Sequence, residues 1–245
     1  MRIVALWTNE IKQDLEWKIM ICFNKTFSQT KSKEYFQWKF RNNPFGDSLH
    51  IIVFDKSKVV ATRVFWRLDV NDVEAYQCVD TSVLPEYQRK GIFGNTIAIA
   101  LRILKGKLIY NYPNSSSGPL YLKHGWKVVK NSKIVFANLT SLMLQNCLAI
   151  RWNYSVLNWR FKKNPEKKYY LLEKNNNYYI FSKKKFGLYN LLGRVDVKLQ
   201  LECVKPFVCI SYDNYNPGIP IYTKLPFMFY GKSINFPNMY HFDMA

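Results

Sequence analysis

The loop from Gln88 to Gly94 combines residue types and a spacing that suit the binding of an anion. A strand-like run over residues 75–84 leads into it, and apolar residues at helical spacing follow from Phe93. Strand, tight loop and helix start form an anion site, because the first backbone N–H groups of a helix have no internal partner and point along the positive end of its dipole. Gly91 lets the backbone come close to a pyrophosphate, and Gly94 leaves the second side of the turn open.

A second block of informative residues follows this loop. Residues 107–112 alternate in polarity and predict another strand, and the turn-rich residues 113–118 come directly after it. Asn114 and Tyr121 then stand seven residues apart, and Gly125 suits the left-handed residue that closes a helix.

These two blocks carry a family resemblance. The first resembles the Q/R-x-x-G-x-G/A signature of the GNAT superfamily of acetyl-CoA-dependent acetyltransferases, in which this loop grips the coenzyme A pyrophosphate. Its residues here are Gln88, Arg89, Lys90, Gly91, Ile92, Phe93 and Gly94. Phe93 stands where the signature usually has glycine or alanine, and Gly94 follows at once. The second block resembles the family's asparagine after the next strand and its tyrosine in the following helix. Together the blocks cover residues 48–138.

The resemblance implies an α/β (α+β) fold, with a mixed, mostly antiparallel sheet flanked by helices. An internal echo adds a second domain: residues 35–44 are matched by residues 156–165, with Trp, Phe and Pro each displaced by 121 positions. Each copy leads into a predicted hairpin, with turns at residues 55–58 and 174–177. We therefore predict a catalytic domain over residues 1–140 that binds acetyl-CoA, and a degenerate GNAT-like domain over residues 141–245 with an acceptor-side or structural role. Coincidence between two aromatic-rich amphipathic helices is the alternative.

Direct acetylation of an amine requires a polarised thioester carbonyl, a protonated leaving thiolate and an amine that has lost its proton. By resemblance, Val83 and Leu84 at the splayed strand end offer a backbone N–H to the thioester carbonyl and pair with the pantetheine arm. Tyr121 is then the general acid that protonates the departing sulfur. Asn114 bonds the pantetheine or the adjacent backbone, or it caps the helix start near Ser115.

The general base is a separate question. Asp80 stands at the end of the strand-like run, where its side chain could face the cleft and take a proton through water. An aspartate that bonds a local turn is an equal alternative. Three histidines without ligand spacing argue against a metal site, so acetyl-CoA is the only co-substrate predicted.

Composition is consistent with a folded enzyme. The chain has 245 residues, of which 48% are apolar, and no apolar run is long enough for a spanning helix. Glu10 and Asp14 argue against a signal peptide, and five scattered cysteines fit a reducing cytoplasm. The net charge of +19 either attracts an anionic partner or reflects lysines solvated over the whole surface. No nucleic-acid-binding module is recognisable.

The predicted function is therefore transfer of an acetyl group to an amine on a small-molecule acceptor. Bacterial tandem proteins that resemble this chain suggest an amino sugar of a surface-polysaccharide pathway, perhaps nucleotide-linked. Two alternatives remain open. One is O-acetylation, and the other is a non-catalytic coenzyme A-binding or basic adaptor protein with the same fold. No feature of the sequence specifies an oligomeric state.

Overall fold

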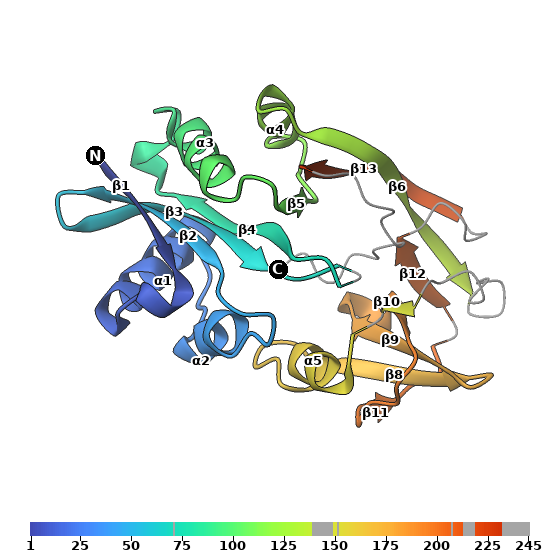
Figure 1. The fold of residues 1–245 in the computed structure, drawn as a ribbon. Coiled ribbons are helices and arrows are strands. Elements are labelled where there is room, and N and C mark those ends of the chain that lie inside the picture. The colour runs from blue at the N-terminus through green and yellow to red at the C-terminus, as the bar shows by residue number, and fades with distance from the viewer. Residues whose placement is uncertain (71, 139–148, 151, 207, 213–218, 232–245) are drawn as a thin grey trace. The chain divides into compact units, whose positions relative to one another are not determined.

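The structure, a computed structural model, describes residues 1–245 except 71, 139–148, 151, 207, 213–218 and 232–245 (Figure 1). These residues form two compact units. The first comprises residues 1–127 together with the segment that begins at Met228, and the second comprises residues 128–227. The boundary predicted at residue 140 lies outside the described residues, so the predicted division stays a prediction.

The first unit is built around a sheet in the order β1-β2-β3-β4-β5-β13. Its elements are β1 (Arg2–Trp7), α1 (Gln13–Phe27), α2 (Lys33–Phe36), β2 (Leu49–Asp55), β3 (Lys58–Arg67), β4 (Ala75–Val83), α3 (Ile92–Ile103), β5 (Leu108–Asn111), α4 (Gly118–Lys123) and the end of β13 (Ile219–Tyr230). Only β4 and β5 pair in parallel, and the other neighbours are antiparallel. The predicted fold class, a mixed and mostly antiparallel sheet flanked by helices, is confirmed.

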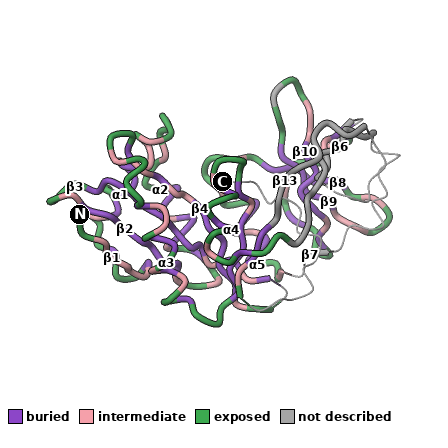
Figure 2. Tube along the Cα trace, turned by 90° about the horizontal axis from the view of Figure 1, so that it is seen from above, coloured by how far each residue is buried: buried purple, intermediate pink, exposed green. Residues whose placement is uncertain are grey.

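Strand alternation places different side chains on the two faces of this sheet. Helix α1 packs against β3 and β4, whereas α3 packs against β1, β2 and β3 (Figure 1). Along β3, Thr62 and Val64 face the α1 side, and Arg63 and Phe65 face the α3 side. Both faces are covered, so β2 and β3 are buried along nearly their whole length (Figure 2).

The strands of the second unit follow the order β6-β12-β10-β9-β8-β11, with β7 beside β10. Its elements are β6 (Lys127–Asn138), β7 (Ala149–Ile150), α5 (Tyr154–Leu157), β8 (Tyr169–Lys174), β9 (Asn177–Lys183), β10 (Tyr189–Val195), β11 (Glu202–Cys203) and β12 (Val208–Tyr212). Two apolar clusters fill it, one of them centred on Leu157 and Phe161.

The internal echo of the sequence corresponds to matching local structure. In the first copy, Ser32 caps α2 through the N–H of Tyr35, and a π-helical turn containing Trp38 follows. In the second copy, Asn153 caps α5 in the same way, and a π-helical turn containing Trp159 follows. Each copy leads into an antiparallel hairpin, β2–β3 or β8–β9. The two tryptophans therefore occupy equivalent elements.

The chain leaves the first unit after Lys127 and returns to it at Met228. Strand β6 follows α4 directly, yet it pairs with β12 of the second unit. The end of β13, near the other end of the chain, pairs antiparallel with β5 through Met228, Phe229 and Tyr230. Gly231 ends this strand at φ +101, where an added Cβ would lie 2.4 Å from the Lys107 carbonyl oxygen. Only glycine allows so close an approach of the two backbones.

Candidate active site

The loop that precedes α3 has the backbone geometry of an anion site. Arg89 and Gly91 both have left-handed backbone angles, at φ 60 and φ 72. Gly91 is the residue before the first turn of α3, and no side chain caps that turn. An added Cβ at Gly91 would meet nothing within 4 Å. The first N–H groups of α3, beginning with those of Ile92 and Phe93, have no acceptor within the helix and lie at the positive end of its dipole.

Contacts on both sides hold the loop in place. The side-chain amide of Gln88 donates to the Val83 carbonyl (3.1 Å), and the Tyr87 hydroxyl donates to the Asp55 carboxylate (2.7 Å). Lys90 lies over the Tyr87 ring, 4.9 Å from its centroid. Gln88, Arg89 and Lys90 are exposed, which leaves the two cations accessible to a bound anion.

Gly94 makes room for the side chain of His124. A Cβ added to Gly94 would lie 3.4 Å from Nε2 of His124, the residue that follows α4. The imidazole of His124 is thus beside the start of α3, where it could donate to an anion bound at the helix end.

Strands β4 and β5 separate next to this loop. Their described pairing ends at Gln77 and Tyr110, although β4 continues to Val83. The N–H of Leu84 donates to the Val60 carbonyl of β3 (3.0 Å). Because successive N–H groups along a strand point to opposite edges, the N–H of Val83 is directed to the edge where β5 has diverged. Val83 and Leu84 were both predicted to contact the pantetheine arm. Only the N–H of Val83 faces this edge, because that of Leu84 bonds to β3.

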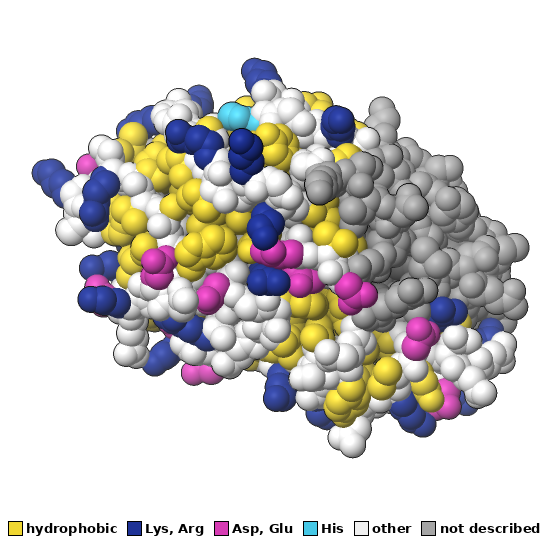
Figure 3. All heavy atoms as spheres, in the orientation of Figure 1, with side chains coloured by type: hydrophobic (Ala, Val, Ile, Leu, Met, Phe, Trp, Pro, Cys, Tyr) yellow, Lys and Arg dark blue, Asp and Glu magenta, His cyan; other side chains and the backbone are white. Residues whose placement is uncertain are grey.

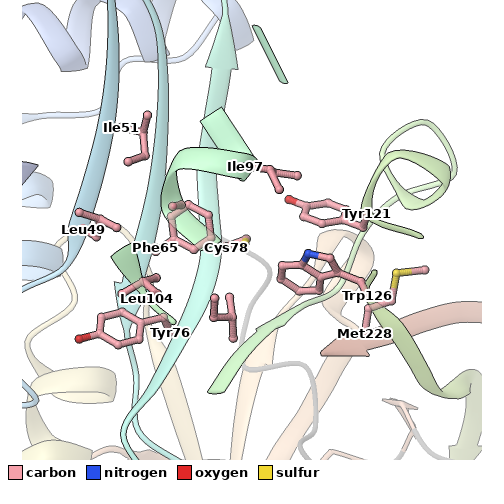
Figure 4. Packing of buried hydrophobic residues seen from close by; sticks show 12 residues of the cluster. Leu49, Ile51, Phe65, Tyr76, Cys78, Ile97, Leu104, Tyr121, Trp126 and Met228 are labelled. Carbon is pink, nitrogen blue, oxygen red and sulfur yellow. The ribbon is translucent and has the colours of Figure 1, made fainter. Parts of the chain in front are cut away.

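Tyr121 lies in the apolar core on the α3 face of the sheet (Figure 4). It is 2% exposed, and its ring packs edge-on against Phe93 and Trp126, with centroids 5.4 and 4.7 Å away. Its hydroxyl accepts a hydrogen bond from Arg63 (2.9 Å) and lies beside Cys78. Burial raises the pKa of Tyr121 well above its ordinary value, and Arg63 opposes that increase. The phenol is therefore protonated at every physiological pH.

Arg63 is a site residue that sequence reasoning missed. Its side chain is buried, donates to Thr96 (3.1 Å) as well as to Tyr121, and stacks 4.0 Å from the Phe93 ring centroid. Among the described residues no carboxylate pairs with it, and its Nη2 has no partner. A buried guanidinium without a counter-ion is costly, and such groups concentrate at functional sites. In the sequence, Arg63 stands within the mostly apolar run from Val59 to Trp66, and a charged residue in such a run could have marked it as a site residue.

Asp80 lies on the opposite, α1 face of the sheet from Tyr121. Its backbone is left-handed (φ 47) at an irregularity in the β3–β4 pairing, where the register shifts between Thr62 and Val64. Both carboxylate oxygens accept from Nζ of Lys39, at 2.9 and 3.0 Å. The predicted base is thus ion-paired with a lysine.

Asn114 holds the turn that precedes α4. Its side-chain oxygen accepts from the N–H and the hydroxyl of Ser117, both at 2.9 Å, and its carbonyl accepts from Gly118 (2.9 Å). The helix itself begins at Gly118 with Ser117 as its N-cap residue, three residues beyond the predicted start at Ser115, so Asn114 bonds the preceding turn and does not cap the helix. Its predicted contact with the pantetheine stays a prediction. The amide nitrogen of Asn114 is exposed together with the rest of the residue.

The described residues show no concentrated charge on the face in Figure 3, no metal-binding group and no membrane-spanning helix. Figure 3 shows Lys and Arg side chains spread over the described part of one face, with Asp and Glu side chains among them. Within the described ranges, no group of three or more His, Cys, Asp or Glu residues could hold a metal ion. No helix in that part of the chain is long and apolar enough to cross a membrane.

Comparison with known proteins finds a matching family model and several solved structures with a similar fold. A family model described as an acetyltransferase (GNAT) domain matches residues 9–129. No curated protein matches the sequence. Among solved structures, a conserved protein of unknown function from Enterococcus faecalis V583, a probable N-acyltransferase, has a TM-score of 0.61 at 10% identity, covering 93% of this chain and 72% of that one. A GCN5-related N-acetyltransferase from Anabaena variabilis has a TM-score of 0.59 at 13% identity, with the same coverage. A putative acetyltransferase from Pyrococcus horikoshii has a TM-score of 0.60 at 14% identity. The match covers 99% of this chain and 94% of that chain.

Proposed function

We propose, from the premise that residues 9–129 form a GNAT acetyltransferase domain, that this chain transfers an acetyl group from acetyl-CoA to an amine. The observation that carries the proposal is the uncapped start of α3 behind the left-handed Gly91, next to the point where β4 and β5 separate. This arrangement can hold a pyrophosphate at the helix end and an extended pantetheine arm along β4.

Coenzyme A would be held by several groups of the loop together. The N–H groups at the start of α3 bind the pyrophosphate, and Arg89 and Lys90 supply positive charge at its exposed side. The Val83 N–H, at the open edge of β4, polarises the thioester carbonyl.

The proton transfers are divided between the two faces of the sheet. Asp80, on the α1 face, takes the proton that the amine loses as its nitrogen bonds to the thioester carbon. Tyr121, on the α3 face, gives its proton to the sulfur as the carbon–sulfur bond breaks. Arg63, bonded to the Tyr121 oxygen, stabilises the negative charge left there. Asp80 then releases its proton to solvent and Tyr121 takes one up from solvent, so both groups return to their starting states.

Replacing Tyr121 with phenylalanine tests the acid role directly. We expect little change in the Kd for acetyl-CoA and a fall in turnover of roughly 10- to 1,000-fold, because water replaces the phenol only in part. The rate is measured as thiol release under conditions where chemistry is limiting. Tyr76→Phe is the matched control, since Tyr76 belongs to the same apolar cluster but its hydroxyl donates to Glu74. Equal turnover of Tyr121→Phe and the parent protein would make Tyr121 a packing residue.

Replacing Arg63 with methionine tests its support of Tyr121. We expect turnover to fall about 10- to 100-fold at saturating acetyl-CoA, because the phenolate loses its neighbouring positive charge, with KM unchanged. Arg63→Lys should restore part of the rate. Arg102→Met, which removes an exposed arginine of α3, is the control. Loss of folding in Arg63→Met, with full activity in Arg63→Lys and no change in the pH profile, would indicate a structural role alone.

The second unit is proposed to be a degenerate copy of the first. The support is the matched pair of capped helical turns, tryptophan-bearing π-helical turns and hairpins. No Q/R-x-x-G-x-G/A loop occurs after Leu191, so this unit would contribute to the acceptor side or to stability.

The amine could be that of an amino sugar, the acceptor that resemblance to bacterial tandem proteins suggests. A sugar would bring several hydroxyl groups to the acceptor side, and each of them needs a hydrogen-bonding partner once it leaves water.

A further inference from the structure

The loop that joins β9 to β10 carries the most exposed large apolar side chain among the described residues. Phe186, in the middle of this loop, is 96% exposed, and the next most exposed side chain of this kind reaches 65%. Lys183 and Tyr189 pair at the base of the loop. Just beyond them, the Lys184 N–H donates to the Leu188 carbonyl (2.7 Å). A loop closed in this way keeps the ring in water, away from both apolar clusters of the second unit.

The backbone of Phe186 is also unusual. Its φ of 59 lies in the left-handed region, which is disfavoured for a bulky side chain. The other left-handed residues in the described part of the chain are glycine or polar, and the hairpin between β8 and β9 places Asn175 and Asn176 at such angles. Asparagine suits this conformation, so the turn alone does not require phenylalanine. A residue that is both strained and exposed points to a role in contact with a partner.

Lysines flank this ring. Lys183 and Lys184 are exposed, and within the described ranges neither pairs with a carboxylate. Strand β8 begins beside the end of β9, and Lys168, just before β8, is ion-paired with Glu202 and adds no net charge. The loop thus combines one apolar ring with two positive charges that no neighbouring carboxylate neutralises.

We propose that this loop binds an anionic lipid surface, with the Phe186 ring inserted among the headgroups and Lys183 and Lys184 at the phosphates. Apolar rings insert at the boundary between headgroups and acyl chains, and lysines near a membrane are attracted to anionic lipids. A protein partner would need a broad apolar patch around the ring, whereas exposed lysines flank it here. The proposal is independent of acetyl transfer, and it assigns a partner to part of the net charge of +19.

Cosedimentation of the full chain with lipid vesicles tests the proposal. Vesicles of phosphatidylglycerol and phosphatidylcholine in equal amounts should bind the chain at least about 10-fold more tightly than vesicles of phosphatidylcholine alone. Phe186→Ser should weaken binding to the anionic vesicles about 10-fold, because serine has no apolar surface to insert. Phe186→Trp should retain it. Trp17→Ser, which removes an exposed aromatic side chain of α1, is the control and should leave binding unchanged.

A second pair of variants separates the loop from the overall charge. Replacing Lys183 and Lys184 together with glutamine should weaken binding to the anionic vesicles about 10-fold. Replacing Lys12 and Lys33, two exposed lysines of the first unit, removes the same charge and should have a much smaller effect. Thermal unfolding checks that each variant is folded.

Equal binding of Phe186→Ser and the parent chain to anionic vesicles would overturn the proposal. Equal losses in the two lysine pairs would do the same, since binding would then follow from total charge alone. Absence of binding to both kinds of vesicle would also overturn it. If a single-stranded oligonucleotide bound the chain more tightly than anionic vesicles, and Phe186→Ser weakened that binding, the loop would be assigned to nucleic acid instead.

Discussion

Gly91→Glu is expected to raise the Kd for acetyl-CoA by about 100-fold or more while the protein stays folded. Gly91 has φ 72 and open space around its Cβ position, so a glutamate side chain would project into the region where the pyrophosphate is proposed to bind. Its negative charge would face the phosphates and occupy the N–H groups at the start of α3. Calorimetric titration with acetyl-CoA measures the change.

The chain offers a closely matched control in Gly106→Glu. Gly106 also has a left-handed backbone, at φ 81, and nothing lies within 4 Å of an added Cβ. The two variants therefore share the same new charge and a similar backbone strain, of about 1–2 kcal/mol. They differ in that Gly106 follows α3, whereas Gly91 precedes it. Equal affinities for acetyl-CoA in the two variants would contradict the proposed loop.

Ending the chain after Phe227 is expected to unfold the first unit and abolish acetyl-CoA binding. The truncation removes Met228, Phe229 and Tyr230, which pair with β5, and Met228 is 3% exposed within the same apolar cluster as Tyr121. Loss of one buried methionine alone costs about 2–5 kcal/mol, a large part of the usual stability of a domain. Thermal unfolding and calorimetry measure the two effects.

A chain that ends after Gly231 is the control for this truncation. It keeps the whole strand β13 and differs from the shorter chain by four residues at the end. We expect it to unfold cooperatively and to bind acetyl-CoA. If the chain that ends at Phe227 had the same melting temperature and affinity, the pairing of β13 with β5 would be unimportant for the first unit.

Features that depend on neighbouring residues could be predicted from the sequence. The strand before the loop, the left-handed Gly91 and the helix after it are local, and each follows from side-chain pattern or backbone freedom. The hairpins around residues 55–58 and 174–177 were predicted for the same reason and are confirmed.

Features that depend on distant residues could not be predicted in this way. The Lys39–Asp80 ion pair joins a helical turn to a strand 41 positions later. The contact of Arg63 with Tyr121 spans 58 positions. Local pattern identifies Asp80 and Tyr121 as polar groups near a strand end and a helix end, but it cannot assign them to opposite faces of the sheet. The irregularity in β4 that directs Asp80 toward Lys39 has no glycine to mark it in the sequence.

The late completion of the first unit's sheet has a consequence for how the protein is made on the ribosome. The partner of Asn111 is Met228, so β5 lacks this neighbour until synthesis has passed Met228. At 5–20 residues per second, the delay is of the order of ten seconds. During that time the nascent first half presents an open strand edge that invites pairing with other chains. The first unit can therefore complete its sheet only after residues 228–230 have emerged, and we expect chaperones that shield such edges to bind the nascent chain until then.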